Sequence, residues 1–143
     1  MPVFSGQFKY TFDAKGRVNI PAPFRIQLQE KREDGSDSHD NLFFHITYGT
    51  EPCLYVYPRS EFKVEMDKMG SISNPLMGNV DEDQLKLSRR VMSFAQPVRC
   101  DQQGRIVVPK EHIEHAGIEN EVLIVGMGNR IELWNPETFK KYI

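Results

Sequence analysis

Residues 13–21 read Asp13-Ala14-Lys15-Gly16-Arg17-Val18-Asn19-Ile20-Pro21, a pattern typical of a tight turn, a short strand and the start of a helix. Asp13 can accept hydrogen bonds from the backbone that follows it, and Gly16 can take a positive φ at little cost. We therefore expect a hairpin whose turn presents Lys15 and Arg17.

The residues on either side of this turn alternate between apolar and polar, as in half-buried strands. The alternating apolar residues are Phe8, Tyr10, Phe12, Val18 and Ile20. Pro21 suits the first turn of a helix, where its missing N–H is not needed. The helix is expected to run to about Glu30, with Phe24 and Leu28 on one face.

The same pattern occurs again 88 residues later, as Asp101-Gln102-Gln103-Gly104-Arg105-Ile106-Val107-Val108-Pro109. Asp, Gly, Arg and Pro coincide position by position, and the alternating strand positions stay apolar. A single Asp-x-x-Gly-Arg turn is common, but two copies with matching apolar positions indicate an internal duplication.

The paired motifs resemble those of the MraZ family, bacterial transcriptional regulators linked to the division and cell wall gene cluster. That family carries two swapped-hairpin modules of the AbrB/SpoVT type, each marked by an Asp-x-x-x-Arg motif. The residues that match are Asp13, Arg17, Asp101, Arg105 and the ending 125–134. The resemblance extends from about residue 6 to residue 142.

The resemblance implies an α+β fold in which two tandem, duplicated modules interlock around one small β-barrel-like core, with peripheral helices. The expected division is a first module over 6–57, a helical segment and linker over 58–93, and a second module with a C-terminal helix over 94–143. Each half has roughly 50–60 residues, which is marginal for a separate core, so size also favours interlocking.

The remaining elements follow from composition and periodicity. Predicted strands are 42–47, 53–57, 121–126 and 130–134, and predicted helices are 81–93, 109–116 and one from Pro136. Phe62, Met66 and Met69 form the apolar stripe of a further helix and are expected in the core. The glycines and proline of 70–78 predict a linker. The terminal helix should place Phe139 and Ile143 on one side.

Residues 31–41 are polar, acid-rich and without an apolar side chain, which predicts an exposed loop. The closing residues Tyr57 and Phe62 correspond to Trp134 and Phe139 at an offset of 77, whereas the motifs are offset by 88. The first half is therefore longer by 11 residues, and this loop accounts for the difference.

Composition favours a soluble globular protein in the cytoplasm. Of the 143 residues, 39% are hydrophobic and 27% charged, and no apolar run approaches the ~20 residues of a membrane helix. No secretion signal is visible at the N-terminus. Cys53 and Cys100 are expected to be reduced thiols.

The net charge of −2 is unusual for a protein that binds nucleic acid, but its distribution is uneven. Within the first 25 residues, Lys9, Lys15, Arg17 and Arg25 face Asp13 alone, a local net charge of +3. Because salt screens interactions beyond roughly 10 Å, a local basic face on an acidic body is compatible with phosphate binding. The alternative is that these are ordinary solvated charges.

These four basic residues and Arg105 are the candidate DNA-binding side chains. Lys15 and Arg17 suit phosphates or guanine edges, since a guanidinium can bind either bidentately. Arg17 has a structural alternative, which is to pair with Asp13 and brace the turn, and both roles are compatible. The expected structural motif residues are Asp13, Gly16, Asp101 and Gly104.

The first copy is expected to dominate DNA affinity. Gln102 and Gln103 stand where the first copy has Ala14 and Lys15, and glutamine brings no charge. In the family a Pro-x-x-apolar-Arg run follows the motif, which the segment 21–25 fits. The second copy has His112 and Ile113 there, which argues against a basic role for that helix.

No other motif indicates chemistry. His112 and His115 have a spacing that a metal could use, but nothing supports further ligands, and a solvated helix face is the simpler interpretation. The loop 126–129 lacks the features of a dinucleotide-binding loop and predicts a hairpin turn. We expect no catalytic residues, no metal, no cofactor and no small-molecule substrate.

Two functions remain after an enzyme is set aside. As the resemblance implies, the first is a regulator associated with the nucleoid, which binds short promoter repeats in double-stranded DNA as a ring-shaped homo-oligomer without a membrane partner. The second is a non-enzymatic, oligomeric protein-interaction scaffold whose turns contact a protein.

Overall fold

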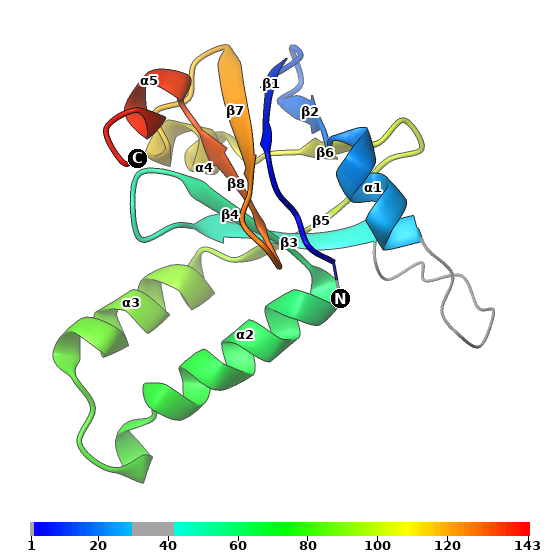
Figure 1. The fold of residues 1–143 in the computed structure, drawn as a ribbon. Helices are drawn as coiled ribbons and strands as arrows, with labels where there is room; N and C mark the ends of the chain where they lie inside the picture. Colours follow the sequence, from blue (N-terminus) through cyan, green and yellow to red (C-terminus); the bar gives the residue numbers. More distant parts are fainter. Residues whose placement is uncertain (1, 30–41) are drawn as a thin grey trace.

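A computed structural model describes residues 2–29 and 42–143, so the acidic loop predicted at 31–41 lies outside the described residues. The elements in chain order are β1 (Gln7–Thr11), β2 (Arg17–Asn19), α1 (Ala22–Gln29), β3 (Phe43–Tyr48), β4 (Leu54–Pro58), α2 (Arg59–Ile72), a short 3-10 helix (Pro75–Met77), α3 (Glu82–Ser93), β5 (Gln96–Arg99), β6 (Arg105–Val107), α4 (Lys110–His115), β7 (Glu121–Gly126), β8 (Ile131–Trp134) and α5 (Pro136–Phe139). The prediction of an α+β fold is confirmed (Figure 1).

The strands pair across the two halves of the chain. The larger sheet has the antiparallel order β1-β7-β8-β4-β3-β5, and β2 pairs with β6 in a separate two-stranded ribbon. Exchanging the two halves replaces β1 by β5, β3 by β7 and β4 by β8, and the reverse. The result is the same strand order, read from the opposite edge of the sheet. In the ribbon Val18 lies opposite Ile106, which is its own counterpart in the duplicated motif. A pseudo-twofold axis therefore passes through this pair.

Two expectations about the strands were wrong. Within the described residues the sheets do not close into a barrel, because the edge strands β1 and β5 each pair with a single described neighbour. The segments before and after the first turn do not form a hairpin with each other either. The chain crosses from β1, which pairs with β7, to β2, which pairs with β6. The turn was predicted correctly, but its two strands find their partners in the other half.

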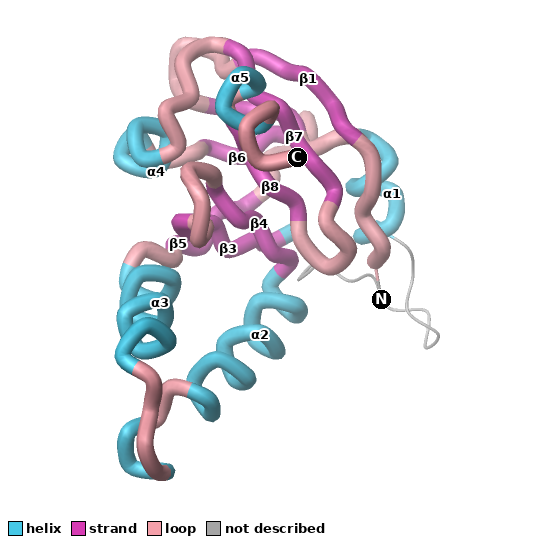
Figure 2. The backbone as a smooth tube through the Cα atoms, turned by 60° about the vertical axis from the view of Figure 1, so that its left-hand side comes forward, coloured by secondary structure: helices cyan, strands magenta, loops and turns pink. Residues whose placement is uncertain are grey.

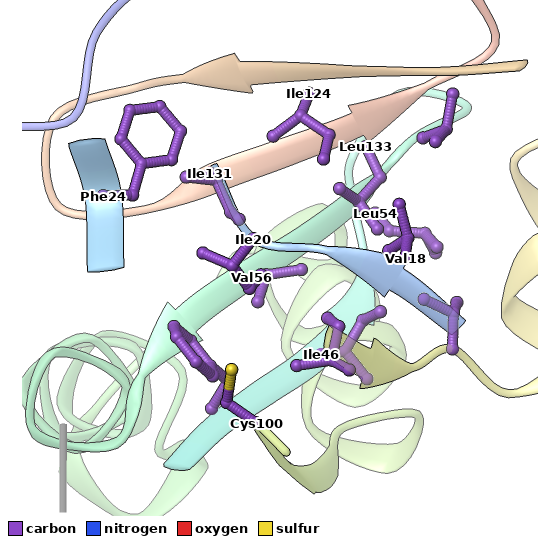
Figure 3. Packing of buried hydrophobic residues seen from close by; sticks show 14 of the residues in the cluster. Val18, Ile20, Phe24, Ile46, Leu54, Val56, Cys100, Ile124, Ile131 and Leu133 are labelled. Carbon is purple, nitrogen blue, oxygen red and sulfur yellow. The ribbon is translucent and has the colours of Figure 1, made fainter. Parts of the chain in front are cut away.

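One core fills the space between the sheet and the ribbon (Figure 3). Val18 and Ile106 point inward from the ribbon and are no more than 1% exposed. They meet side chains from the inner face of the sheet, including Ile46, Leu54, Val56, Ile124, Ile131 and Leu133. Phe24 and Leu28 of α1 are buried in this core, as their spacing predicted.

Helices α2 and α3 extend away from the sheet as a pair (Figure 2). For that reason Phe62, Met66 and Met69 are only half-buried, and the prediction that they form part of the core was wrong. The expected linker begins later than predicted, because α2 continues to Ile72. The Asn74 side chain then accepts a hydrogen bond from Leu76 N at 3.0 Å and starts the 3-10 helix.

The ends of the other helices follow from their capping residues. The Asp81 side chain accepts a hydrogen bond from Asp83 N at the start of α3, and Asn135 does the same for Glu137 N at α5. Helix α4 ends where Gly117 takes a φ of +63°. Phe139 is buried at α5, but Ile143 is 81% exposed, so the expectation of a shared apolar side was wrong.

The described helices give no sign of a bilayer-spanning segment. Within residues 2–29 and 42–143, each one is too short or too polar to cross a membrane.

Candidate nucleic-acid interface

The first motif forms a turn that its aspartate holds rigid. Asp13 Oδ1 accepts hydrogen bonds from the backbone N–H groups of Lys15 and Arg17, both at 2.9 Å. Asp13 Oδ2 accepts from Arg17 Nε at 2.6 Å. Gly16 closes the turn with a φ of +76°, a conformation that favours glycine. The predicted brace between Arg17 and Asp13 is therefore present.

The second motif repeats this geometry bond for bond. Asp101 Oδ1 accepts from the N–H groups of Gln103 and Arg105 at 2.9 Å, and Oδ2 accepts from Arg105 Nε at 3.0 Å. Gly104 has a φ of +80°. The duplicated sequence thus builds duplicated turns.

The two turns are tied to each other through the ribbon. Ile20 N donates to Gly104 O at 2.8 Å, and Val108 N donates to Gly16 O at 2.9 Å. Arg105 also reaches across the ribbon, and its Nη1 lies 3.9 Å from Asp13 Oδ2. Because each turn is hydrogen-bonded to the other half, neither can move without the other.

The outer face of the ribbon collects polar and basic side chains. Alternation along β2 and β6 buries Val18 and Ile106 and turns their neighbours outward. The outward residues are Arg17, Asn19, Arg105 and Val107. We call this surface, with the two turns at its ends, the ribbon face. Lys15 is exposed beside it on the first turn.

The two arginines of the ribbon face differ in the hydrogen-bond donors that they leave free. Arg105 bonds Asp101 through Nε, approaches Asp13 through Nη1 and bonds the Gln103 side chain through Nη2. Arg17 bonds only through Nε, so within the part of the chain that the structure describes both of its Nη groups lack a partner. A guanidinium with two free Nη groups can bind a phosphate or a guanine edge bidentately.

Arg25 lies elsewhere and contacts the second turn. Its Nε donates to Ile20 O at 3.0 Å. Glycine has no Cβ atom, and one placed on Gly104 would lie only 2.6 Å from Arg25 Nε. Arg25 therefore packs directly on the glycine of the second motif. The residue that corresponds to Arg25 in the second half is Ile113, which lies beside the first turn. A Cβ atom placed on Gly16 would lie 3.8 Å from Ile113 Cδ1.

Lys9 is in the middle of β1, away from the ribbon strands, and lies 3.9 Å from Glu121. The structure thus brings Lys15, Arg17 and Arg105 together on the ribbon and its turns. Arg25 contacts the far turn, and Lys9 belongs to a different element.

One basic residue at this site, Lys110, was not among the candidates predicted from the sequence. A cavity of about 480 Å³ lies between the first turn and the start of α4, and Lys15 and Lys110 both line it. Asp13 and Glu119 line it as well. Lys110 directly follows the Pro of the second motif, so the available signal was a basic residue at the start of that helix.

The carboxyl group of Asp13 is expected to titrate far below an ordinary aspartate. The backbone N–H of Arg17 is the main cause, and burial partly opposes it, so that the pKa falls from 3.8 to about 2. Because the folded-state pKa is depressed, the contribution to stability is complete above pH 3.8 and is lost as the pH falls through about 2.

Carboxyl-carbon NMR should therefore give a midpoint near 2 for Asp13. The pKa of Asp101 should also lie below its usual range, since the backbone N–H of Arg105 donates to it. A midpoint for Asp13 at the ordinary value of 3.8 would contradict the hydrogen bonding described here.

The two histidines of α4 do not form the solvated face expected from sequence. His112 is 1% exposed, and its Nε2 lies 2.7 Å from Phe94 O. His115 stacks on Tyr48 at 3.8 Å and lies 3.1 Å from Arg90 Nη2. Both rings are therefore packing elements that join α4 to β3 and α3, and that interpretation of the sequence was wrong.

Within the described residues, no three His, Cys, Asp or Glu side chains are placed to hold a metal ion. Cys53 and Cys100 are free and buried. Burial raises the pKa of both thiols, which keeps them protonated and unreactive at neutral pH.

Comparison with known proteins places this geometry in a family. The model of one family, described as "MraZ protein, putative antitoxin-like", matches residues 3–81 and 91–143. Two relatives are each named "Transcriptional regulator MraZ" and are 36% identical to the chain. The one from Carboxydothermus hydrogenoformans aligns over 98% of this chain and 86% of its own length, and the one from Pediococcus pentosaceus over 99% and 87%. A relative of the same name from Cytophaga hutchinsonii is 31% identical over 100% of the chain and 86% of its own length.

Proposed function

Because the chain belongs to the MraZ family, we propose that it is a DNA-binding transcriptional regulator. It binds short promoter repeats upstream of the division and cell wall gene cluster, as a ring-shaped homo-oligomer at the nucleoid. Its support is the resemblance of the paired motifs to that family and the relatives, which are transcriptional regulators by name. It assigns no enzymatic step to the chain.

The observation that carries the proposal is the free Nη pair of Arg17 on a turn held by three hydrogen bonds to Asp13. A preorganised guanidinium loses little side-chain freedom on binding, which favours recognition of a phosphate or of guanine. Exposed Lys15 lies two residues before it on the same turn and supplies a second positive charge. We assign base readout to Arg17 and phosphate contact to Lys15.

The other candidate residues take supporting roles in this proposal. Arg105 has its nitrogens engaged by Asp101, Gln103 and Asp13, so it contributes charge to the ribbon face more than base readout. Arg25 positions the second turn through Gly104. Lys9, exposed on edge strand β1, adds a phosphate contact at the margin.

A single subunit of this kind binds weakly, because one lysine and one or two arginines neutralise few phosphates. Several copies on one ring, each facing a repeat in the same promoter, bind together through their high effective concentration. Selection of bound sequences from random DNA tests the proposal. The selected sequences should contain a short motif at regular spacing. The alternative is a protein-interaction scaffold, which the exposed Val107 of the ribbon face would also suit. Such a scaffold would select no DNA motif.

Lys15→Ala should weaken binding to all DNA sequences alike. Each lost phosphate contact releases about one counterion fewer, so the slope of log K against log salt should fall by roughly one unit per site. Affinity measured across a salt series for operator and random DNA checks this. Lys68→Ala, which removes an equal charge from α2, should leave the slope unchanged. An equal loss of slope in both variants would remove Lys15 from the interface.

The assembly is expected to be a closed oligomer larger than a tetramer. A ring requires each subunit to use different surfaces toward its two neighbours. Light scattering on the protein at micromolar concentration measures the mass directly. A monomer or a dimer under these conditions would contradict the ring. The high effective concentration that lets several subunits bind one promoter together would then be lost.

A further inference from the structure

A second cavity lies away from the ribbon face, between β3 and the first turns of α2. Its volume is about 490 Å³, and it is lined by His45 of β3 and by one side of α2 from Arg59 to Asp67. Cavities of 300–1,000 Å³ are typical of sites for small organic molecules, whereas an inorganic ion needs far less room.

Two of the described side chains that line this cavity are cationic. Arg59 and Lys63 line it, and the guanidinium groups of Arg59 and Arg99 lie 5.6 and 5.2 Å from the centre of the Phe43 ring. Within residues 2–29 and 42–143, none of these three cations makes an ion pair. Asp67 is the one acidic residue of the described lining. An anion is therefore the ligand that this environment favours.

One wall is aromatic. The rings of His45 and Phe62 stack with their centres 4.3 Å apart and their planes 3° from parallel. Met66 adds a thioether next to them on α2, and sulfur packs well against aromatic rings. His45 Nδ1 is buried and has no hydrogen-bond partner in the part of the chain that the structure describes. Burial lowers the pKa of His45, so the imidazole is neutral at physiological pH.

Another cavity of the structure has the opposite charge. Its volume is about 360 Å³, and it lies at the start of α5. That cavity is lined by Glu119, Glu121 and Glu137. The cations are therefore a local feature of the cavity beside α2 and are not shared by this second cavity.

We propose that the cavity beside α2 binds a small organic anion that contains an aromatic ring, of the class formed by nucleoside monophosphates and aromatic carboxylates. Arg59 and Lys63 hold the phosphate or carboxylate, and the Ser60 hydroxyl donates to it. The ring packs on Phe62 and Met66. Asp67 accepts a hydrogen bond from an amino or imino group at the other end of the ligand. This function is independent of DNA binding and adds a ligand to the regulator.

Isothermal titration calorimetry on the intact oligomer tests the proposal with defined probes. Adenosine monophosphate and indole-3-acetate represent the phosphate and the carboxylate sources, and inorganic phosphate and adenosine supply the acid and the ring separately. We expect at least one of the two complete probes to bind once per subunit, and at least about tenfold more tightly than either fragment.

Arg59→Gln combined with Lys63→Gln should weaken that binding by at least about tenfold, because two charge-assisted hydrogen bonds are lost. Lys68→Gln, on the same helix but outside the cavity, is the matched control and should bind as the unchanged protein does. Circular dichroism of the double variant establishes that α2 still folds.

Three results would overturn the proposal. Neither complete probe binds at millimolar concentration, inorganic phosphate binds as tightly as both, or the double variant binds its probe unchanged. If the double variant loses DNA affinity and no probe binds, the cations are DNA contacts. The proposed regulator would then stand while this inference falls, so the two failures can be told apart.

Discussion

Phe24→Ala is expected to lower the free energy of unfolding by about 3–5 kcal/mol, which is the usual range for removing a buried aromatic ring. Phe24 is 2% exposed, and its ring centre lies 4.9 Å from that of Phe4 and 5.2 Å from that of Phe8. It joins α1, the N-terminal segment and β1 at one end of the core (Figure 3). The cavity left by alanine would have three elements around it, none of which can collapse into it freely.

Urea unfolding at one fixed protein concentration measures this loss, since the stability of an oligomer depends on concentration. Ile26→Ala is the matched control, because Ile26 lies on the same helix but is 62% exposed. Its expected effect is within about 0.5 kcal/mol. A loss below about 1 kcal/mol for Phe24→Ala would mean that α1 is not anchored in the core as described.

Local structure could be predicted from this sequence because its determinants are local. Asp13 and Gly16 specify a turn through their own backbone, and strict alternation specifies the strands beside it. The pairing of those strands could not be predicted in the same way. An isolated turn favours a hairpin, and only the long-range pairs of β1 with β7 and β2 with β6 show that the halves exchange strands.

In the candidate site, too, the contacts within one turn could be predicted from the sequence and those between the turns could not. The brace between Asp13 and Arg17 follows from their spacing and is present. The difference between the two arginines does not follow from spacing, because it depends on a glutamine side chain in the second turn and on the approach of Arg105 to Asp13. Lys110 was not predicted for a similar reason, since it comes to line one cavity with Lys15 through the pairing of the two halves in the ribbon.

The histidines illustrate what periodicity alone cannot determine. His112 and His115 have the spacing and polar neighbours of an exposed helix face. In the fold, Tyr48 stacks on the half-buried His115 and meets the buried His112 edge to face. Such contacts join residues more than 60 positions apart, so no local window contains them.

Arg17→Lys should leave the oligomer intact and yet lower the discrimination between operator and random DNA by roughly tenfold or more. Lysine keeps the charge and can still pair with Asp13, so the turn should persist. It lacks the planar fork whose free Nη groups are the proposed base contacts, and one bidentate contact is worth about 1–3 kcal/mol of discrimination. The ratio of operator to random-DNA affinity, measured at one salt concentration, reports this loss, and light scattering confirms that the assembly is unchanged.

Arg105→Lys is the matched control that the duplication provides. Arg105 makes the same bond to its own aspartate, but its Nη groups are already directed at Gln103 and Asp13. Its replacement should therefore reduce discrimination less than the replacement of Arg17 does. If Arg105→Lys abolishes operator binding while Arg17→Lys has no effect, then base readout belongs to the second turn. In that case the bonds that hold Arg105 in the free protein must break when DNA binds, and the assignment made here is inverted.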